Sequence, residues 1–257
     1  MQAYGPSFAR VYNKKWQLFA QRIAPWLRLF YESQPISQQS RVLLDVCCGA
    51  GHLAAHFLEN GYTVTGIDLS EHMLRYAREN NAAYAATGQV RFVQADAAHF
   101  TVEGPFGLAV STYDALNHLP DQAALRGCFE SVYPLLLPGG WFIFDLNTRA
   151  ALLHWNNILV DDDPECMIVN RGLYDESSGK AWMFISGFIC TGHKEDGTPL
   201  YERFQEMVYN IVYDLSWVQQ TLHEVGFGLV YPAQINDLYT PLKEPEKEGR
   251  VFFVAQK

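Results

Sequence analysis

Hydrophobic residues near the start of the chain recur at three- and four-residue steps, with charged residues between them. Between residues 7 and 33 these positions are Phe8, Val11, Tyr12, Trp16, Phe19, Ile23, Trp26, Leu27 and Phe30. This spacing places them on one face of a helix. The segment therefore predicts an amphipathic helix. We expect it to divide at Pro25, because proline has no backbone N–H to donate.

From residue 41 onward, short apolar runs alternate with helical stretches. The runs read RVLLDVC, YTVTGIDL, VRFVQAD, FGLAVSTYD and WFIFDLN. The helical stretches read GHLAAHFLENG, SEHMLRYARENNAAYAA and DQAALRGCFESVYPLL, and Ser70 is a predicted N-cap of the second. Strands that alternate with helices predict βαβ units and an α/β fold with a parallel sheet.

The pattern becomes β-type after the fifth run. MIVNRGLYDE, AWMFISGFICTGH and YERFQEMVYNIVYD are separated by the turn-forming SSGK and KEDGTP, which predicts antiparallel hairpins. A helix, LSWVQQTLHEVGF, and two strands follow, so the β-rich piece is an insertion. We expect an N-terminal helical cap (1–39), a core (40–150 and 215–257) and an inserted β-lid (151–214).

Composition limits the kinds of partner. The 257 residues are 49% hydrophobic, and 19 basic against 28 acidic residues give a net charge of −9. This acidity argues against a nucleic-acid partner. Charged residues interrupt every long apolar run, and the N-terminus lacks the apolar core of a signal peptide. We therefore expect a cytoplasmic protein without a membrane partner.

Cysteine and histidine spacing gives no metal motif. The five cysteines contain no C-x-x-C pair, and Cys47 and Cys48 are either a redox pair or two reduced thiols in a tight turn. His52 and His56 are four residues apart, but neither an H-E-x-x-H motif nor a third ligand accompanies them. We expect no bound metal.

The glycine-rich turn after the first strand carries the main functional signal. Gly49, Gly51 and Ala54 fit the pattern G-x-G-x-x-A, and Asp68 ends the next strand 17 positions after Gly51. Such a turn brings backbone close to a ligand, and the acidic residue is placed for a ribose diol. By itself this pattern fits NAD, FAD or S-adenosylmethionine.

Asp45 bears on the choice among these ligands. It ends the first strand, immediately before the turn. A carboxylate there repels the pyrophosphate of a dinucleotide, whereas S-adenosylmethionine presents an ammonium and a cationic sulfur. S-adenosylmethionine is thus favoured, and an NAD(P)-linked oxidoreductase is the alternative.

Four motifs extend this interpretation. LLDVCCGAG, GIDLS, VQAD and LLLPGGWFIFDLN, in this order within residues 41–147, resemble the motifs of class I S-adenosylmethionine-dependent methyltransferases. The resemblance implies a Rossmann-like, doubly wound sheet of seven strands, mostly parallel with the last strand antiparallel. The aromatic N-terminal helix and the β-lid are similar to the small-molecule group, which includes sugar N,N-dimethyltransferases and glycine/sarcosine methyltransferases. In one departure, Cys47 stands where the family commonly has glycine.

The resemblance assigns roles to matching residues. Asp45 and the turn from Gly49 to Gly51 would hold the methionine part, and Asp68 the ribose. The other implied cofactor contacts are Leu69, Met73, Asp96 and Ala97 at the adenine, and Tyr12 and Ser111. For Tyr12, the alternative is a helix that merely packs on the core.

Residues after the fourth strand are the candidates for catalysis. In-line methyl transfer depends mainly on positioning, and a base is needed only where the acceptor must lose a proton. Tyr113 could contact the sulfonium and His118 could be a base; alternatively, Asp114 and Asn117 organise the loop while His118 packs.

We expect methyl transfer to a small amine, hydroxyl or carboxylate metabolite, with nitrogen or oxygen favoured over carbon, by a monomer or homodimer. A catalytically inactive cofactor-binding subunit is a further alternative. Within the lid, the candidates to line an acceptor pocket are Trp182, Phe184, Phe188 and Tyr201, and the candidates to hold an acidic acceptor are Arg171, Lys180, His193 and Arg203.

Overall fold

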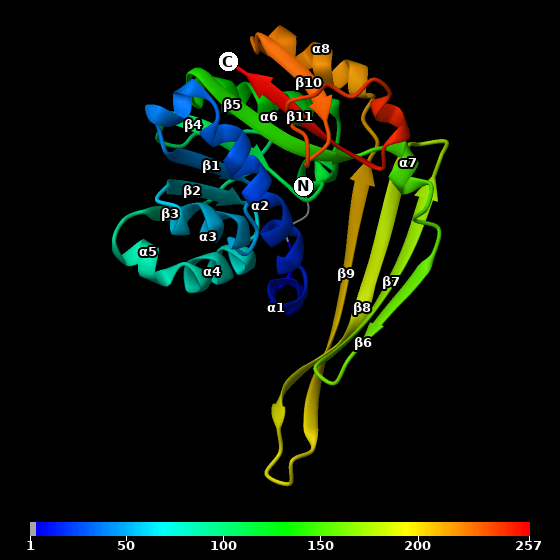
Figure 1. Ribbon diagram of the computed structural model, residues 1–257. Coiled ribbons are helices and arrows are strands. Elements are labelled where there is room, and N and C mark those ends of the chain that lie inside the picture. The colour runs from blue at the N-terminus through cyan, green and yellow to red at the C-terminus, as the bar shows by residue number, and fades with distance from the viewer. Residues whose placement is uncertain (1–3) are drawn as a thin grey trace.

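A seven-stranded sheet forms the core of the computed structural model, which describes residues 4–257 (Figure 1). Its strands are β1 (Val42–Val46), β2 (Thr63–Asp68), β3 (Val90–Gln94), β4 (Phe106–Ser111), β5 (Leu136–Asn147), β10 (Leu229–Ala233) and β11 (Arg250–Gln256). The strand order is β10-β11-β5-β4-β1-β2-β3. Strands β1 to β5 are parallel, and β11 is antiparallel to both of its neighbours, which confirms the predicted fold class.

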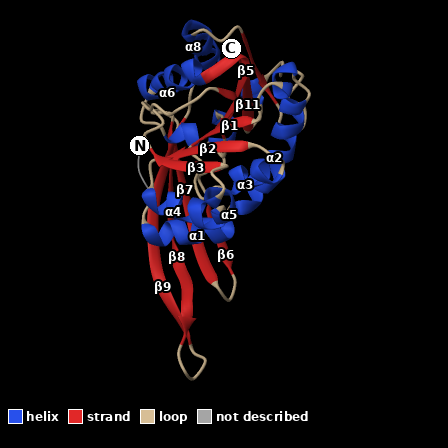
Figure 2. Cartoon of the chain, turned by 90° about the vertical axis from the view of Figure 1, so that its left-hand side faces the viewer, coloured by secondary structure: helices blue, strands red, loops and turns tan. Residues whose placement is uncertain are grey.

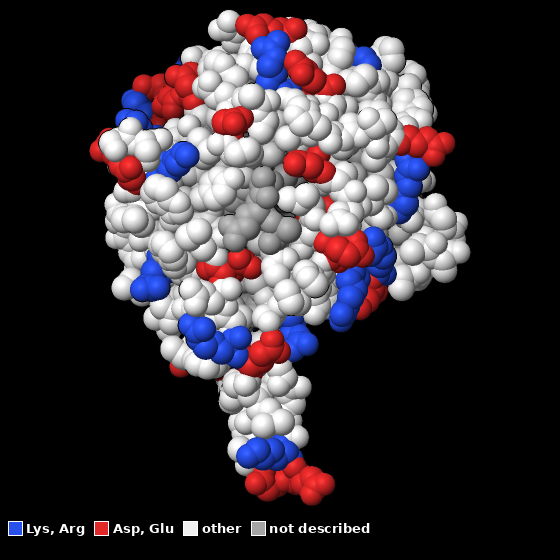
Figure 3. All heavy atoms as spheres, turned by 180° about the vertical axis from the view of Figure 1, so that it is seen from behind, with Lys and Arg blue, Asp and Glu red and all other residues white. Residues whose placement is uncertain are grey.

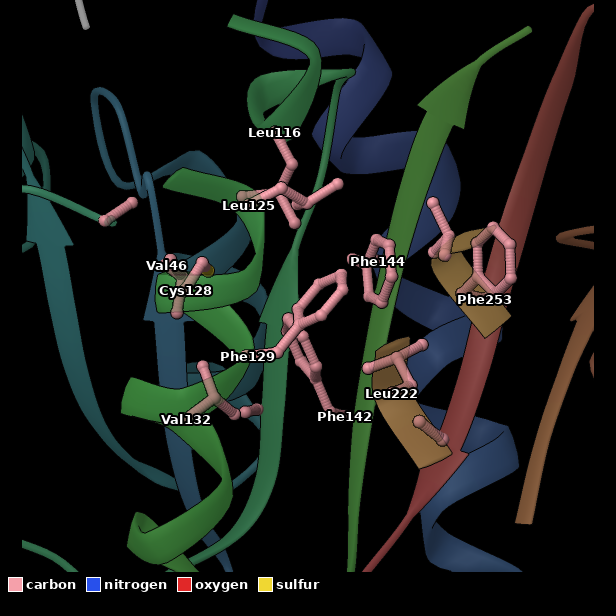
Figure 4. Close-up of a cluster of buried hydrophobic side chains, with 14 of the residues drawn as sticks. Val46, Leu116, Leu125, Cys128, Phe129, Val132, Phe142, Phe144, Leu222 and Phe253 are labelled. Carbon is pink, nitrogen blue, oxygen red and sulfur yellow. The ribbon is translucent and has the colours of Figure 1, made fainter. Parts of the chain in front are cut away.

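Helices cover both faces of this sheet. They are α3 (His52–Glu59), α4 (Glu71–Asn80), α5 (Ala82–Ala86), α6 (Gln122–Leu135) and α8 (Leu215–Val225). On one face, Phe129 of α6 and Leu222 of α8 pack with Phe142, Phe144 and Phe253 of the sheet (Figure 4). On the other face, α3 and α4 pack together with the second N-terminal helix. The predicted N-cap is confirmed, because Ser70 Oγ accepts the Met73 N–H.

The N-terminal segment divides at a different place from the one predicted. Helix α1 (Pro6–Lys15) ends before Trp16, which separates it from α2 (Gln17–Glu32). Helix α2 continues through Pro25 without a break, and the short η1 (Pro35–Gln38) follows. The prediction of a division at Pro25 was therefore wrong. Ile23, Ala24 and Leu27 are buried around this proline, and their packing maintains the helix despite the missing backbone donor.

The inserted segment forms a second, antiparallel sheet. Its strands are β6 (Ile158–Asp162), β7 (Cys166–Asp175), β8 (Lys180–His193) and β9 (Pro199–Ile211), reached through α7 (Arg149–Leu152). Strand β6 was not predicted. The sheet projects from the core, and the β8–β9 hairpin reaches farthest (Figure 1). We call this sheet the lid.

Helix α1 lies between the lid and the core, beside β9 (Figure 2). Its Phe8 and Val11 pack with Ile168, Ile185 and Phe204 of the lid. Its opposite side contributes Ala9 to a cluster with Ala50 and Met73 of the core. The helix therefore joins both parts along one side of the site described below.

An amide network fixes the base of the lid. Asn117, in the short helix η2 (Ala115–His118), donates through Nδ2 to the carbonyls of Asn147 and Ile211, at 3.1 and 2.9 Å. Asn147 Nδ2 donates to Asn210 Oδ1 at 2.9 Å. Asn117 thus has the organising role that was one alternative for it, because it links the loop after β4 to the last lid strand.

The surface carries mixed charge on the face shown in Figure 3, where lysine and arginine are interspersed with aspartate and glutamate. The third short helix, η3 (Pro245–Lys247), lies in the charged loop before β11. Within residues 4–257, none of the helices is long and apolar enough to span a bilayer.

Candidate active site

A cavity of about 320 Å³ lies where β1, β2 and β4 end. Three parts of the molecule contribute side chains to its wall: α1, the loops at the carboxyl ends of the core strands, and the lid. Among the predicted site residues, those that line it are Tyr12, Gly49, Asp68, Leu69, Met73, Tyr113 and His118. This position is the expected one for a ligand of an open α/β sheet.

The two glycines of the turn have different surroundings. Gly49 (φ 55°) faces the cavity, and a Cβ there would lie 3.3 Å from Met73 Cε. Gly51 (φ 73°) faces α4 instead, where a Cβ would lie 2.7 Å from Asn81 Nδ2. Cys47, the departure from the family pattern, also has a left-handed backbone (φ 61°). Glycine adopts this conformation more easily than cysteine does, so the turn keeps its shape at some cost in strain.

Asp68 is held by the turn that it faces. Its Oδ2 accepts the Gly49 N–H and its Oδ1 accepts the Ser70 N–H, both at 2.9 Å. Burial raises the pKa of the carboxyl, and the backbone hydrogen bonds oppose that shift. A carboxylate oxygen accepts more than one hydrogen bond, so Asp68 can also receive the two hydroxyls of a ribose.

Asp45 faces a smaller cavity, of about 30 Å³, next to the first. The residue is 2% exposed and its Oδ2 has no hydrogen-bond partner. Burial, with a smaller contribution from Asp68, raises the pKa of its carboxyl to about 8. His52, at the start of α3, lines the same cavity, and its Nε2 is likewise buried without a partner. An unpartnered carboxyl oxygen and an unpartnered ring nitrogen around one small space fit an ammonium group, such as that of S-adenosylmethionine.

Besides Asp45, which lines the smaller cavity, four predicted cofactor residues do not line the larger cavity: Gly51, Asp96, Ala97 and Ser111. Asp96 Oδ1 accepts the Ala98 N–H at 2.9 Å, so this carboxylate closes a turn. Ala97 and Ser111 are each 1% exposed, and Ser111 Oγ has no partner. Their assignment to the cofactor remains a prediction from the resemblance.

The loop after β4 has a strained backbone held by buried charges. Tyr113 (φ 69°) and Asp114 (φ 49°) are both left-handed, and their N–H groups donate to the carboxylate of Asp145, at 2.6 and 2.9 Å. Arg250, at the start of β11, donates to Asp145 and, at 2.7 Å, to Asp114. The Tyr113 ring stacks on Phe19, 4.3 Å between centroids, and the Arg250 guanidinium lies over both rings.

His118 lies between a backbone carbonyl and a carboxylate. Its Nδ1 lies 2.5 Å from the carbonyl oxygen of Tyr209, and its Nε2 lies 3.9 Å from Asp114 Oδ2. Burial lowers the pKa of the imidazole, although Asp114 and the Tyr209 carbonyl oppose this shift. The neutral ring therefore carries its proton on Nδ1, bonded to Tyr209, and Nε2 is left with a lone pair.

The lid residues that line the cavity differ from those expected. None of Trp182, Phe184, Phe188 and Tyr201 lines it; Phe188 and Tyr201 are 46% and 48% exposed. The lid side chains present are Asn170, Met183, Ile185, Val208 and Tyr209, and Trp155 joins them from the segment between α7 and β6. Likewise, none of the four candidate lid cations lines it, and Arg250 of the core does.

Comparisons with known proteins agree with this geometry. A family model described as a methyltransferase domain matches residues 43–140. A putative methyltransferase of Geobacillus sp. strain WCH70 is 30% identical over 98% of each chain. Among solved structures, an S-adenosylmethionine-dependent methyltransferase of Clostridium acetobutylicum superposes with a TM-score of 0.77, at 20% identity over 97% of each chain. A sugar N-methyltransferase of Streptoalloteichus superposes at 0.72, with 19% identity over 100% of this chain and 96% of the other.

The cofactor turn and these full-length similarities lead to one assignment. Gly49 and Asp68 have the backbone and carboxylate that a nucleoside needs, and Asp45 has an unpartnered oxygen for an ammonium. The chain belongs to the S-adenosylmethionine-dependent methyltransferases of class I.

Proposed function

We propose that this protein transfers a methyl group to the nitrogen or oxygen of a small molecule bound between the core and the lid. One observation carries the proposal: a single cavity joins the cofactor turn, at Gly49 and Asp68, to His118 and to the lid residue Asn170. The superposition on a sugar N-methyltransferase supports a small acceptor. In this proposal the lid (151–214) holds the acceptor, and residues 1–39 cap the cofactor.

The chain's own residues position and assist the reaction. S-adenosylmethionine, when bound, supplies an activated methyl group. Asp68 orients the ribose and Asp45 the ammonium, while Tyr12 and Tyr113 present aromatic rings to the cationic sulfur. Nε2 of His118 receives the proton that the acceptor gives up. The apolar lid side chains exclude water from the reacting groups.

The first prediction concerns Asp68. Replacing it by alanine removes charge-assisted hydrogen bonds to the ribose, which are worth about 1.5–3 kcal/mol. We expect S-adenosylhomocysteine to bind about tenfold to a hundredfold more weakly, as measured by calorimetry. Asp196→Ala, on the exposed hairpin tip, is the matched control and leaves the affinity unchanged.

The same assays test the proposed activity and its alternatives. Radiolabelled S-adenosylmethionine is offered with a panel of small amines and alcohols, and labelled product is expected with wild type but reduced with Asp68→Ala. Tight binding of S-adenosylhomocysteine without transfer to any acceptor would instead support an inactive cofactor-binding subunit. Binding of NAD in place of S-adenosylhomocysteine would support the oxidoreductase alternative.

A second prediction follows from the raised pKa of Asp45. With a pKa of about 8, this carboxyl is mostly protonated at pH 7 in the free protein. An ammonium beside it favours the ionised form, so binding of S-adenosylhomocysteine releases a proton. We therefore expect affinity to increase between pH 6 and 7.5, by at most about tenfold per pH unit.

Calorimetry in buffers of different ionisation enthalpy measures this proton release. Asp45→Asn removes the titrating group, and the pH dependence should disappear. 5′-Methylthioadenosine lacks the amino-acid part and serves as the matched ligand, with no pH dependence in either protein. Equal pH dependence for both ligands would show that another group is responsible.

A further inference from the structure

An amide oxygen without a hydrogen-bond partner lies on the lid side of the cavity. Asn170, on β7, lines the cavity, and its Oδ1 is buried without a hydrogen-bond partner. Its cross-strand neighbour is Ile185, and the nearby lining residues Met183 and Val208 are apolar. A buried oxygen without a donor is costly, so a ligand that brings an N–H or O–H to this point gains affinity.

The charges around the cavity disfavour an acidic acceptor. Among the described lining residues, Arg250 is the only one with a permanent positive charge, and it is already paired with Asp114 and Asp145. Asp68 and Asp114 add negative charge to the wall. A carboxylate or phosphate in this space would lose its hydration and find no free cation.

Asn170 and the candidate base lie at different places along the lid. Asn170 pairs with Ile185, and Ile185 pairs with Glu206 on β9, three residues before Tyr209, whose carbonyl contacts His118. Two strand spacings and three residues along a strand separate the Cα atoms of Asn170 and Tyr209 by about 14 Å. This separation leaves room for a ligand with two functional groups, one at Asn170 and one beside His118.

We propose that the acceptor is an amine or alcohol with an apolar body and a second N–H or O–H group, which donates to Asn170 Oδ1, and that organic acids are excluded. This inference rests on the proposed function and narrows it, since the sequence left carboxylates among the possible acceptors. Asn170 is the specificity-determining residue, and the reacting nitrogen or oxygen lies at the His118 end.

Three matched probes test the inference. trans-4-Aminocyclohexanol, cyclohexylamine and trans-4-aminocyclohexanecarboxylate share a ring and an amine, and they differ only in the second group. Binding is measured by ligand-observed NMR on the protein saturated with S-adenosylhomocysteine. We expect the amino alcohol to bind about tenfold more tightly than cyclohexylamine, and the amino acid to bind more weakly than both.

Two variants of Asn170 separate hydrogen bonding from shape. Asn170→Leu should abolish the preference for the amino alcohol, while the affinity for S-adenosylhomocysteine and the melting temperature stay unchanged. Asn170→Asp, which keeps an acceptor oxygen, should retain the preference. Equal binding of the amino acid, a preference that persists in Asn170→Leu, or failure of the amino alcohol to bind at millimolar concentration would overturn the inference.

Transfer assays keep the two proposals apart. If labelled S-adenosylmethionine methylates small molecules but the rate is independent of Asn170, the proposed function stands and this inference fails. If the amino alcohol binds through Asn170 but neither it nor any other small molecule is methylated, the binding site stands and the proposed function fails.

Discussion

Replacing Arg250 by methionine is expected to lower the free energy of unfolding by about 3–5 kcal/mol, the usual effect of removing one partner from a buried ion pair. The Arg250 side chain is three-quarters buried and bridges Asp114 to the fully buried Asp145. Methionine retains much of the aliphatic volume but leaves two carboxylates without a cation. Urea denaturation followed by circular dichroism measures the loss.

Two comparisons give this prediction a sharp test. Arg171→Met replaces an exposed lid arginine and should change stability by less than about 0.5 kcal/mol, as most surface substitutions do. Adding Asp145→Asn to Arg250→Met removes one uncompensated charge, so the double variant should recover part of the loss. A decrease below about 1 kcal/mol in Arg250→Met would contradict a structural role for the ion pairs.

The core of the fold could be predicted because its signals are local. Alternating strands and helices, the turn with Gly49 and Gly51, and the N-cap Ser70 each occupy a few consecutive residues. The break between α1 and α2 could not be placed in this way. It depends on how α1 packs between lid and core, while the local signal, Pro25, lies inside a continuous helix.

The face of the lid could not be assigned because β8 is apolar on both sides. Along AWMFISGFI, residues of both parities are hydrophobic, so alternation does not show which set faces inward. In the structure Met183 and Ile185 face the cavity, whereas Trp182 and Phe184 belong to the opposite parity and do not line it. The prediction chose the large aromatic residues as the lining of the acceptor pocket, whereas non-aromatic apolar residues of β8 form the cavity wall.

Several polar residues of the site were missed because their partners are distant in sequence. Arg250 is 105 residues from Asp145 and 136 from Asp114, and it follows a charged loop that gives no motif. Asn170 lies between Val169 and Arg171 on β7, and only its position at the cavity distinguishes its amide. Asp145 lies in FDLN, the end of the motif LLLPGGWFIFDLN. An aspartate at the end of an apolar strand was the signal that could have identified it as a site residue.

His118→Ala is expected to lower kcat/KM by about 10²–10⁴-fold, the usual contribution of a general base, while S-adenosylhomocysteine binds as in wild type. Burial places the pKa of this imidazole below its ordinary value of 6.5, so wild type should be fully active at pH 7 and lose activity only below the lowered pKa. This loss of activity at low pH is the acid limb of the pH profile. It is measured with a hydroxyl acceptor, because a hydroxyl does not itself titrate between pH 5 and 8. In His118→Ala the limb should disappear.

The surroundings of His118 explain why the pH profile is the deciding measurement. Asp114 favours the protonated ring, but Arg250 occupies that carboxylate, and the Tyr209 carbonyl fixes the tautomer through Nδ1. NMR titration of the resting protein gives the same pKa independently of turnover. His193→Ala, which removes an exposed lid histidine, is the matched control. If His118→Ala left both kcat/KM and the acid limb unchanged, transfer would depend on positioning alone. The acceptor would then lose its proton without help from a protein base.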